Sequence, residues 1–327
     1  MSLLEVTNLS VTFHTDAGRV QAVSGVSFSM HPGETLAVVG ESGSGKSVTA
    51  LALMGLLGKA ALVEGSASFE GTELVGLTEG ELRAIRGKRI GMIFQDPMTA
   101  LNPVFTVGAQ IVEIIRVHTR IDKKEAWGRA TDLLDLVGVP EPKRRAHQYP
   151  HEFSGGMRQR ALIAMAIANN PTLLIADEPT TALDVTVQAQ VLEVIAKVQD
   201  VTKSAVMLIT HDLGVVAGYA DRVQVMYAGQ IVEKGDLDEI FYDTRNPYTH
   251  ALLRSIPSAI AHPGAALQTI GGSPPSLLRL PRGCYFHPRC HMADDACAVT
   301  RQELVEVGNG HLSRCHRHDA VSGGARG

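Results

Sequence analysis

The sequence predicts an α/β protein whose core is interrupted by a block of helices and followed by a small module rich in cysteine and proline. Short apolar runs bounded by turn residues occupy residues 3–39 and return after residue 173, where they alternate with helical periodicity. Between about residues 98 and 168 the pattern is mostly helical. After about residue 237 prolines become frequent, and all four cysteines lie between Cys284 and Cys315.

The elements follow one another in a regular order. Turn residues at 16–18 and 32–33 separate the first apolar runs, and a helical pattern begins at Gly45. The expected strands are Leu4–Thr7, Val26–Met30, Thr35–Val39, Ser66–Phe69, Arg89–Phe94, Leu173–Ala176 and Ala205–Ile209, with a hairpin of Arg222–Tyr227 and Gln230–Glu233 over Ala228 and Gly229. The expected helices after the first are Val107–His118, Lys123–Val137, Gly156–Ala168 and Val185–Val201.

Composition and charge exclude several classes of protein. Of 327 residues, 45% are hydrophobic and 20% charged, which is the balance of an ordinary globular protein. The formal charge of −4 offers no basic surface for nucleic acid. The longest apolar stretch, residues 50–58, is far shorter than the ~18 residues of a membrane span. The N-terminus lacks a secretory signal pattern, so we expect a cytoplasmic protein that binds no nucleic acid.

A glycine-rich segment is the first motif with a chemical meaning. Residues 40–47 read GESGSGKS, which fits the phosphate-binding pattern G-x-x-x-x-G-K-[ST], between an apolar strand and a helical pattern. Glycines let the backbone wrap around phosphate, and N–H groups converge at the helix N-terminus. Lys46 can reach the β- and γ-phosphates, and Ser47 can ligate Mg²⁺. The predicted nucleotide-binding residues here are Gly40, Ser42, Gly43, Ser44, Gly45, Lys46, Ser47 and Val48.

Two further motifs suit the same chemistry. Asp177 and Glu178 follow a buried strand, which places one carboxylate to hold Mg²⁺ through water and the other to polarise an attacking water. Residues 154–156 read Ser-Gly-Gly at the start of a helix, which is a second anion-binding arrangement. An isolated Ser-Gly of this kind is more often a simple helix cap.

The ordered set of motifs resembles the ATPase subunits of ABC transporters. Residues 153–160, FSGGMRQR, resemble the family's signature, although Phe153 and Met157 stand where many members have Leu and Gln. Gln95 resembles the Q-loop, residues 182–184 the D-loop, and His211 the switch histidine. The resemblance covers about residues 1–240 and implies a P-loop ATPase core, an antiparallel β subdomain and an inserted helical subdomain at about 97–169.

The same resemblance implies how ATP is bound and cleaved. Glu178, His211 and Gln95 would be catalytic, and Ser47, Gln95 and Asp177 would hold Mg²⁺. A second, homologous ATPase chain, giving a heterodimer, would be required. The signature residues that would face ATP from the other subunit are Ser154, Gly155, Gly156 and Arg158. Phe13 is the candidate for stacking on adenine, with His14 and Val20 as alternatives.

Two segments near the C-terminus narrow the resemblance. Residues 246–253, NPYTHALL, and 283–290, GCYFHPRC, resemble the ATPases of oligopeptide, dipeptide and nickel importers. This implies an ATPase domain at 1–240 and an extension at 241–327, in a peripheral protein on the cytoplasmic face of the inner membrane. It also implies two integral-membrane permeases and an extracytoplasmic solute-binding protein. Alternatives are an importer of nickel or another small solute, or a non-transport ATPase that senses redox state or iron.

The cysteines suggest a metal centre. Cys284, Cys290, Cys297 and Cys315 are separated by five, six and seventeen residues. Structural zinc usually uses a C-x₂₋₄-C knuckle, whereas long irregular spacings suit thiolates around a [4Fe–4S] cluster, and the resemblance points the same way. Zinc and unliganded redox thiols remain open alternatives. The histidines that could join a zinc site are His287, His291, His311 and His316. They are otherwise expected to be solvated or to lie just outside the ligands of the metal.

Overall fold

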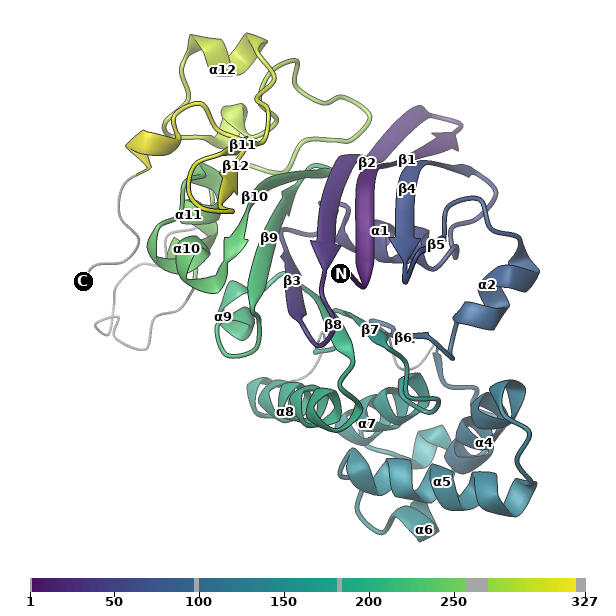
Figure 1. Ribbon diagram of the computed structural model, residues 1–327. Coiled ribbons are helices and arrows are strands. Elements are labelled where there is room, and N and C mark those ends of the chain that lie inside the picture. Colours follow the sequence, from purple (N-terminus) through teal and green to yellow (C-terminus); the bar gives the residue numbers. More distant parts are fainter. Residues whose placement is uncertain (1, 97–99, 181–183, 257–269, 322–327) are drawn as a thin grey trace. The chain divides into compact units, whose positions relative to one another are not determined.

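The computed structural model describes residues 2–96, 100–180, 184–256 and 270–321 (Figure 1). The chain divides into two compact units that interleave along the sequence. The first comprises residues 1–2, 30–34 and 76–209, and the second residues 3–29, 35–75 and 210–327. Both contain helices and strands, so the predicted α/β class is confirmed.

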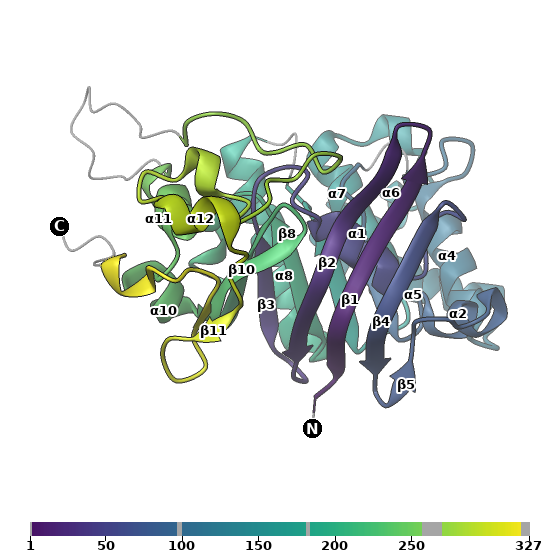
Figure 2. The same ribbon diagram turned by 90° about the horizontal axis from the view of Figure 1, so that it is seen from above.

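A four-stranded sheet forms one part of the second unit, in the order β2-β1-β4-β5. Its long strands lie side by side (Figure 2), and β4 runs antiparallel to both β1 and β5. The first strand was expected to end at Thr7, but it continues through a bulge before Ser10, where Asn8 takes a φ of +50°. The strands are β1 (Leu4–Thr15), β2 (Gly18–Met30), β4 (Ala61–Phe69) and β5 (Thr72–Glu73).

The second unit also holds five strands in the order β11-β12-β10-β9-β3. The pairing of β3 with β9 is parallel, and β9 and β10 form the predicted hairpin over Ala228 and Gly229. The pairing of β12 with β10 is antiparallel, with Glu233 opposite Ser313, so the end of the chain extends this sheet. The strands are β3 (Thr35–Val39), β9 (Arg222–Tyr227), β10 (Gln230–Asp236), β11 (Val305–Glu306) and β12 (Leu312–Ser313).

Three parallel strands and the predicted block of helices make up most of the first unit. The strand order is β8-β7-β6, and nearly every residue of these strands is buried, as expected of a parallel sheet. Residues 97–99, where the helical block was expected to begin, and Ala182 and Leu183 of the expected D-loop lie outside the described residues. The elements are α2 (Glu79–Ile85), β6 (Ile90–Ile93), α4 (Val107–His118), α5 (Lys123–Leu136), α6 (Pro142–Arg145), α7 (Gly155–Ala166), β7 (Leu173–Asp177), α8 (Val185–Thr202) and β8 (Ala205–Thr210).

The remaining helices belong to the second unit. Tyr227, Tyr248 and Phe286 pack together in its core, with ring centroids 4.5–5.3 Å apart, and Phe286 meets both tyrosines edge to face. Glu233 and His311 are also buried there, with His311 Nε2 2.9 Å from Glu233 Oε1. None of the described helices has both the length and the apolar character to cross a membrane. The helices are α1 (Lys46–Leu53), α9 (Leu213–Val216), α10 (Leu237–Tyr242), α11 (Pro247–Arg254) and α12 (Asp295–Val299).

Candidate functional site

The glycine-rich loop joins the buried strand β3 to helix α1. Gly45 precedes the helix with a φ of +103°, and a Cβ atom there would lie 2.6 Å from the carbonyl oxygen of Ala22. A Cβ atom on Gly40 would lie 2.1 Å from the carbonyl oxygen of Met226. Real Cβ atoms do not approach so closely, so the loop needs glycine at both positions to lie against its neighbours.

Lys46 and Ser44 point polar groups into this loop. The Lys46 side chain is buried, and its ammonium group donates hydrogen bonds to the carbonyl oxygens of Gly40 (2.7 Å) and Glu41 (3.0 Å). The Ser44 hydroxyl is buried without a hydrogen-bond partner among the described residues. A held ammonium group and a spare hydroxyl in a glycine-rich turn at a helix N-terminus fit a phosphate group. Of the other predicted loop residues, Ser42 and Gly43 are exposed, and Ser47 and Val48 are half-buried.

Gln95 and Glu178 meet in the first unit at the end of β7. The Gln95 amide nitrogen donates to a Glu178 carboxylate oxygen at 3.0 Å, although the two residues are 83 positions apart. Asp177, the last residue of β7, is 6% exposed. Glu178 has a φ of +45°, and its N–H donates to the carbonyl of Ile209 at 2.9 Å. A left-handed backbone at a residue other than glycine is strained, and such residues are concentrated at functional sites. The sequence did not predict this conformation.

The predicted signature corner caps helix α7. The Ser154 hydroxyl accepts a hydrogen bond from the N–H of Met157 at 3.3 Å, so the structural role of an N-cap is present. Ser154 and Gly155 are exposed, whereas Gly156 and Arg158 are half-buried. Arg158 donates from Nε to the carbonyl of Pro150 at 2.8 Å. The serine and glycine therefore lie at the surface of the first unit.

His211 and Phe13 belong to the second unit, as does the glycine-rich loop. His211 is exposed directly after β8 and lines a surface hollow with Asp212, Leu252 of α11 and the residues that follow this helix. Phe13 is half-buried on β1, opposite Ala61 of β4. Val20 is also half-buried and His14 is exposed. The burial of these three side chains therefore does not identify which of them stacks on adenine.

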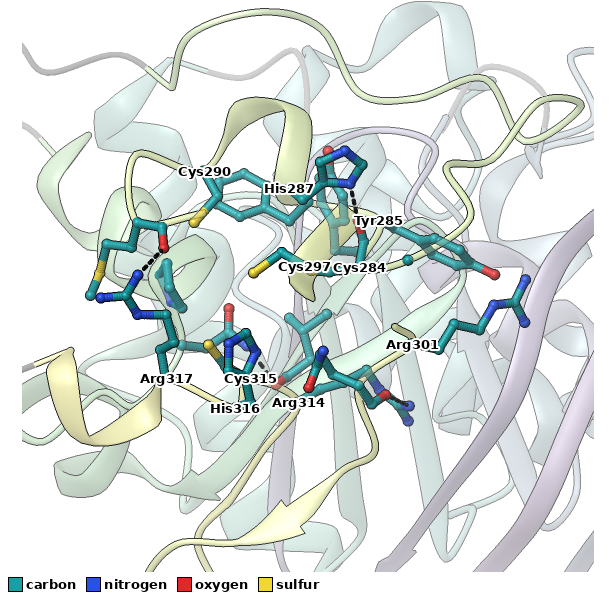
Figure 3. Close-up of a pocket in the computed structure, with 18 of the residues that line it drawn as sticks. Cys284, Tyr285, His287, Cys290, Cys297, Arg301, Arg314, Cys315, His316 and Arg317 are labelled. Carbon is teal, nitrogen blue, oxygen red and sulfur yellow. Dashed lines mark hydrogen bonds between the residues drawn. The ribbon is translucent and has the colours of Figure 1, made fainter. Parts of the chain in front are cut away.

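The four cysteines come from separate segments and line one pocket (Figure 3). All four are free thiols, and the Cys284 N–H donates to the carbonyl of Cys297 at 2.8 Å. Burial raises the pKa of each thiol, and that of Cys315 reaches about 11. At neutral pH the thiols are therefore protonated unless something binds them.

A mixed group of side chains includes two residues that line this pocket. The ligand atoms of Asp294, Cys297 and His316 all lie within 4.8 Å of one another, and His316 Nε2 is 3.0 Å from Asp294 Oδ2. The hydrogen bond from His316 and the contact with Cys297 lower the pKa of Asp294 to about 2. His311, a histidine expected to be solvated or to lie just outside a metal site, is 1% exposed and bonded to Glu233.

A contact that was not predicted joins the glycine-rich loop to the C-terminal segment. Arg289, which precedes Cys290, forms two hydrogen bonds with the carboxylate of Glu41, at 2.6 and 2.9 Å. These bonds raise the pKa of Arg289 above its usual value, so the guanidinium stays charged. The two residues are 248 positions apart, and a single sequence carries no signal that pairs them.

Comparisons with known proteins agree with the motifs. Residues 23–181 match the ABC transporter family, and residues 232–297 match the family described as the oligopeptide/dipeptide transporter C-terminal region. A solved dimer of the ATP-binding cassette MJ0796, in a post-hydrolysis state with ADP and Pi, matches with a TM-score of 0.65. That match has 28% identity and covers 72% of this chain and 98% of the solved chain.

Curated relatives extend the similarity over nearly the whole chain. The protein of Haemophilus influenzae named "Oligopeptide transport ATP-binding protein OppD" is 51% identical to this chain, and the match covers 96% of both chains. The Bacillus subtilis protein of the same name is 56% identical, and the match covers 89% of this chain and 82% of the relative. The Mycobacterium tuberculosis protein of that name is 54% identical over 98% of this chain, which spans 53% of the relative. The chain thus spans about half the length of the mycobacterial relatives it matches.

The predicted [4Fe–4S] cluster is contradicted by these findings. The relatives are named for ATP binding and oligopeptide transport, and the matched families carry no iron–sulfur description. Among the described residues, the side chains grouped closely enough to share one ion are Asp294, Cys297 and His316, which include one of the four cysteines. Cysteine spacing predicted four thiolate ligands, but the path of the folded chain brings a carboxylate and an imidazole to Cys297 instead.

Proposed function

This chain belongs to the family of oligopeptide transport ATP-binding proteins within the ABC transporters, and from that premise we propose that it hydrolyses ATP to power the import of oligopeptides or dipeptides. Similarity over almost the full length of the Haemophilus relative carries this proposal. The name of that relative favours peptides over nickel as the transported substrate. We assign residues 1–240 to the ATPase domain and residues 241–327 to a C-terminal extension.

ATP is the substrate gripped by the loop of residues 40–47. Lys46 neutralises charge on the β- and γ-phosphates, exchanging its bonds to loop carbonyls for bonds to phosphate oxygens. The hydroxyl of Ser47, the amide of Gln95 and the carboxylate of Asp177 offer the hard oxygen ligands that Mg²⁺ prefers. Bound there, Mg²⁺ would supply neutralisation of the phosphate charge. Phe13 is the proposed platform for adenine.

Hydrolysis needs a water molecule aligned with the γ-phosphorus. Glu178 accepts a hydrogen bond from that water and orients it, while Gln95 holds the carboxylate in place, as the 3.0 Å bond between them supports. The water oxygen forms a bond to the γ-phosphorus as the bond to the bridging oxygen breaks, and ADP leaves. The proton of the water passes through Glu178 to the released phosphate. His211 stabilises the charge on the γ-phosphoryl group.

A second, similar ATPase chain completes the site. The residues of that chain that correspond to Ser154, Gly155, Gly156 and Arg158 approach the phosphates bound to this one, since an exposed serine and glycine at a helix N-terminus suit an anion. Each chain contributes one loop and one signature corner, so closure of the pair depends on ATP and opening follows hydrolysis. We propose a heterodimer of two such chains.

The membrane partners are two permeases, with a solute-binding protein outside the cell delivering the peptide. Three exposed apolar side chains support a docking surface in the first unit. Phe94, Val104 and Phe105 are 39%, 70% and 52% exposed, and apolar exposure of this extent is typical of interaction sites. The protein is accordingly peripheral, at the cytoplasmic face of the inner membrane.

The substitution Glu178→Gln tests the catalytic proposal. The variant keeps a hydrogen-bonding side chain for Gln95 but loses the group that accepts a proton, so turnover should fall by about 10²–10⁴-fold while ATP still binds. Phosphate release and the binding of a fluorescent ATP analogue measure the two properties separately. Glu193→Gln, an exposed glutamate of α8 in the same unit, is the matched control and should keep normal turnover. Turnover by Glu178→Gln within about threefold of the wild type would remove Glu178 from the mechanism.

The transported substrate is tested in vesicles. The chain is reconstituted with its permeases and second ATPase, and uptake of a labelled tripeptide and of Ni²⁺ is measured with and without ATP. ATP-dependent peptide uptake without Ni²⁺ uptake is the expected result. The reverse result would replace the peptide proposal with a nickel importer.

A further inference from the structure

We propose that Arg289 is a positioning residue for the phosphate-binding loop, so that the C-terminal segment supports the nucleotide site. The inference rests on the proposed ATPase function, because it concerns affinity for ATP at that site. Its basis is the ion pair between Arg289 and Glu41, the second residue of the loop.

The Arg289 guanidinium is held on all sides. Nη1 and Nη2 each donate to one oxygen of the Glu41 carboxylate, in the two-pronged geometry that makes such pairs strong. Nη1 also donates to the hydroxyl of Tyr227 at 3.2 Å, and Nε donates to the carbonyl of Gly271 at 2.9 Å. The side chain is 5% exposed, so it has a single well-defined position.

Glu41 in turn is fixed through each of its polar groups. Its N–H donates to the hydroxyl of Tyr248 at 2.9 Å, and its carbonyl accepts from Lys46 Nζ at 3.0 Å and from the Ser44 N–H at 3.2 Å. Two of these partners, Tyr248 and Arg289, come from beyond residue 240, and two come from the loop itself. Glu41 therefore transmits the position of the C-terminal segment to Lys46 and Ser44.

Charge gives Arg289 a second effect on ATP binding. The Glu41 carboxylate is negative and lies on the loop that receives a triphosphate, so an unneutralised Glu41 would repel the nucleotide. The guanidinium cancels this charge. Without Arg289, both the geometry of the loop and its electrostatic potential become less favourable for ATP.

The same contacts connect the loop to the pocket lined by the cysteines. Tyr227 and Phe286 line that pocket, and the Arg289 guanidinium lies 5.8 Å and 5.9 Å from the centres of their rings. Cys290 follows Arg289 directly in the chain. Arg289 therefore packs against two side chains of this pocket while it holds Glu41 of the loop.

The experiment compares four variants of the full chain. Equilibrium binding of a fluorescent ATP analogue and steady-state ATPase kinetics are measured for Arg289→Ala, Arg289→Lys, the double variant Glu41→Gln/Arg289→Ala, and the control Arg301→Ala. Arg301 lies in the same C-terminal segment, with its guanidinium 5.3 Å from the centre of the Tyr285 ring. Melting temperatures are recorded for all variants.

Arg289→Ala should weaken ATP binding and raise KM about tenfold, with kcat at saturating ATP kept within about twofold. Arg289→Lys, which keeps the charge but cannot form the two-pronged pair, should fall between this variant and the wild type. The double variant should bind ATP at least about threefold more tightly than Arg289→Ala, because it also removes the exposed negative charge. Such suppression would not follow from general loss of stability.

Two results would overturn the inference. One is ATP affinity within about twofold of the wild type in Arg289→Ala. The other is a double variant that binds no better than Arg289→Ala. If Arg289→Ala does not fold, Arg289→Lys takes its place. A KM for ATP within about twofold of the wild-type value would then overturn the inference. A wild-type chain that binds no ATP would refute the proposed function itself, so the two failures are distinguishable.

Discussion

The conformation of the phosphate-binding loop predicts unequal effects of two glycine substitutions. Gly45 and Gly43 both have positive φ, +103° and +77°, so an alanine at either position costs about 1–2 kcal/mol of backbone strain. Only at Gly45 does the new Cβ meet other atoms, with the Ala22 carbonyl oxygen 2.6 Å away and the Gly229 Cα 3.4 Å away. Relieving this overlap with backbone adds about 1–3 kcal/mol.

The expected loss of stability is therefore about 2–5 kcal/mol for Gly45→Ala and about 1–2 kcal/mol for Gly43→Ala. At about 2–4 °C per kcal/mol for domains of this size, the two melting temperatures should separate by several degrees. Gly58→Ala is the control, because Gly58 has neither positive φ nor an atom within 4 Å of its Cβ position. Gly45→Ala should also weaken ATP binding, since Gly45 immediately precedes Lys46.

Thermal and urea unfolding of the three variants, with an ATP titration, measure these effects. Equal destabilisation by Gly43→Ala and Gly45→Ala would refute the reasoning, because it would mean that the loop does not press against Ala22. Wild-type ATP affinity in Gly45→Ala would refute the link between this packing and the nucleotide site.

Two other buried groups give predictions of their own. His311→Ala removes a partner of the buried Glu233 carboxylate, so it should lower the free energy of unfolding by about 3 kcal/mol. The control His291→Ala changes an exposed residue and should alter this free energy by less than about 0.5 kcal/mol. Similar urea midpoints for the two variants would contradict this prediction. Burial raises the pKa of Cys315 from 9.0 to about 11, so its contribution to stability is complete below about pH 9 and is lost as the pH rises through about 11. Between these pH values the melting temperature of Cys315→Ser should therefore fall less than that of the wild type. Equal falls in the two proteins would show that the Cys315 thiol does not cause the loss of stability.

Much of the fold could be predicted because the relevant signals are local. Helix α4 spans Val107–His118 as the periodicity indicated, with the Thr106 side chain accepting a hydrogen bond from the N–H of Ala109. Helix α2 was not predicted. Thr78 and Glu81 form a reciprocal capping box at its N-terminus, a pattern that can be recognised in the sequence.

Features that depend on distant residues were harder to predict. The strand β1 was expected to end at Thr7, whereas pairing with β4 carries the strand through a bulge as far as Thr15. The ion pair of Glu41 with Arg289 and the burial of His311 against Glu233 arise from tertiary packing, which leaves no periodic trace in the sequence. The error over the iron–sulfur cluster has the same origin, because cysteine spacing does not determine where the sulfur atoms lie.

The most direct test of the account is a structure of the Glu178→Gln variant determined with ATP and Mg²⁺. The account predicts a triphosphate enclosed by residues 40–47, with Lys46 on its β- and γ-phosphates and the substituted glutamine side chain beside the γ-phosphate. The Ser154 corner of a second ATPase chain should face the same nucleotide. A nucleotide bound away from Lys46, or a pair of chains whose Ser154 corners point away from it, would contradict the central claim.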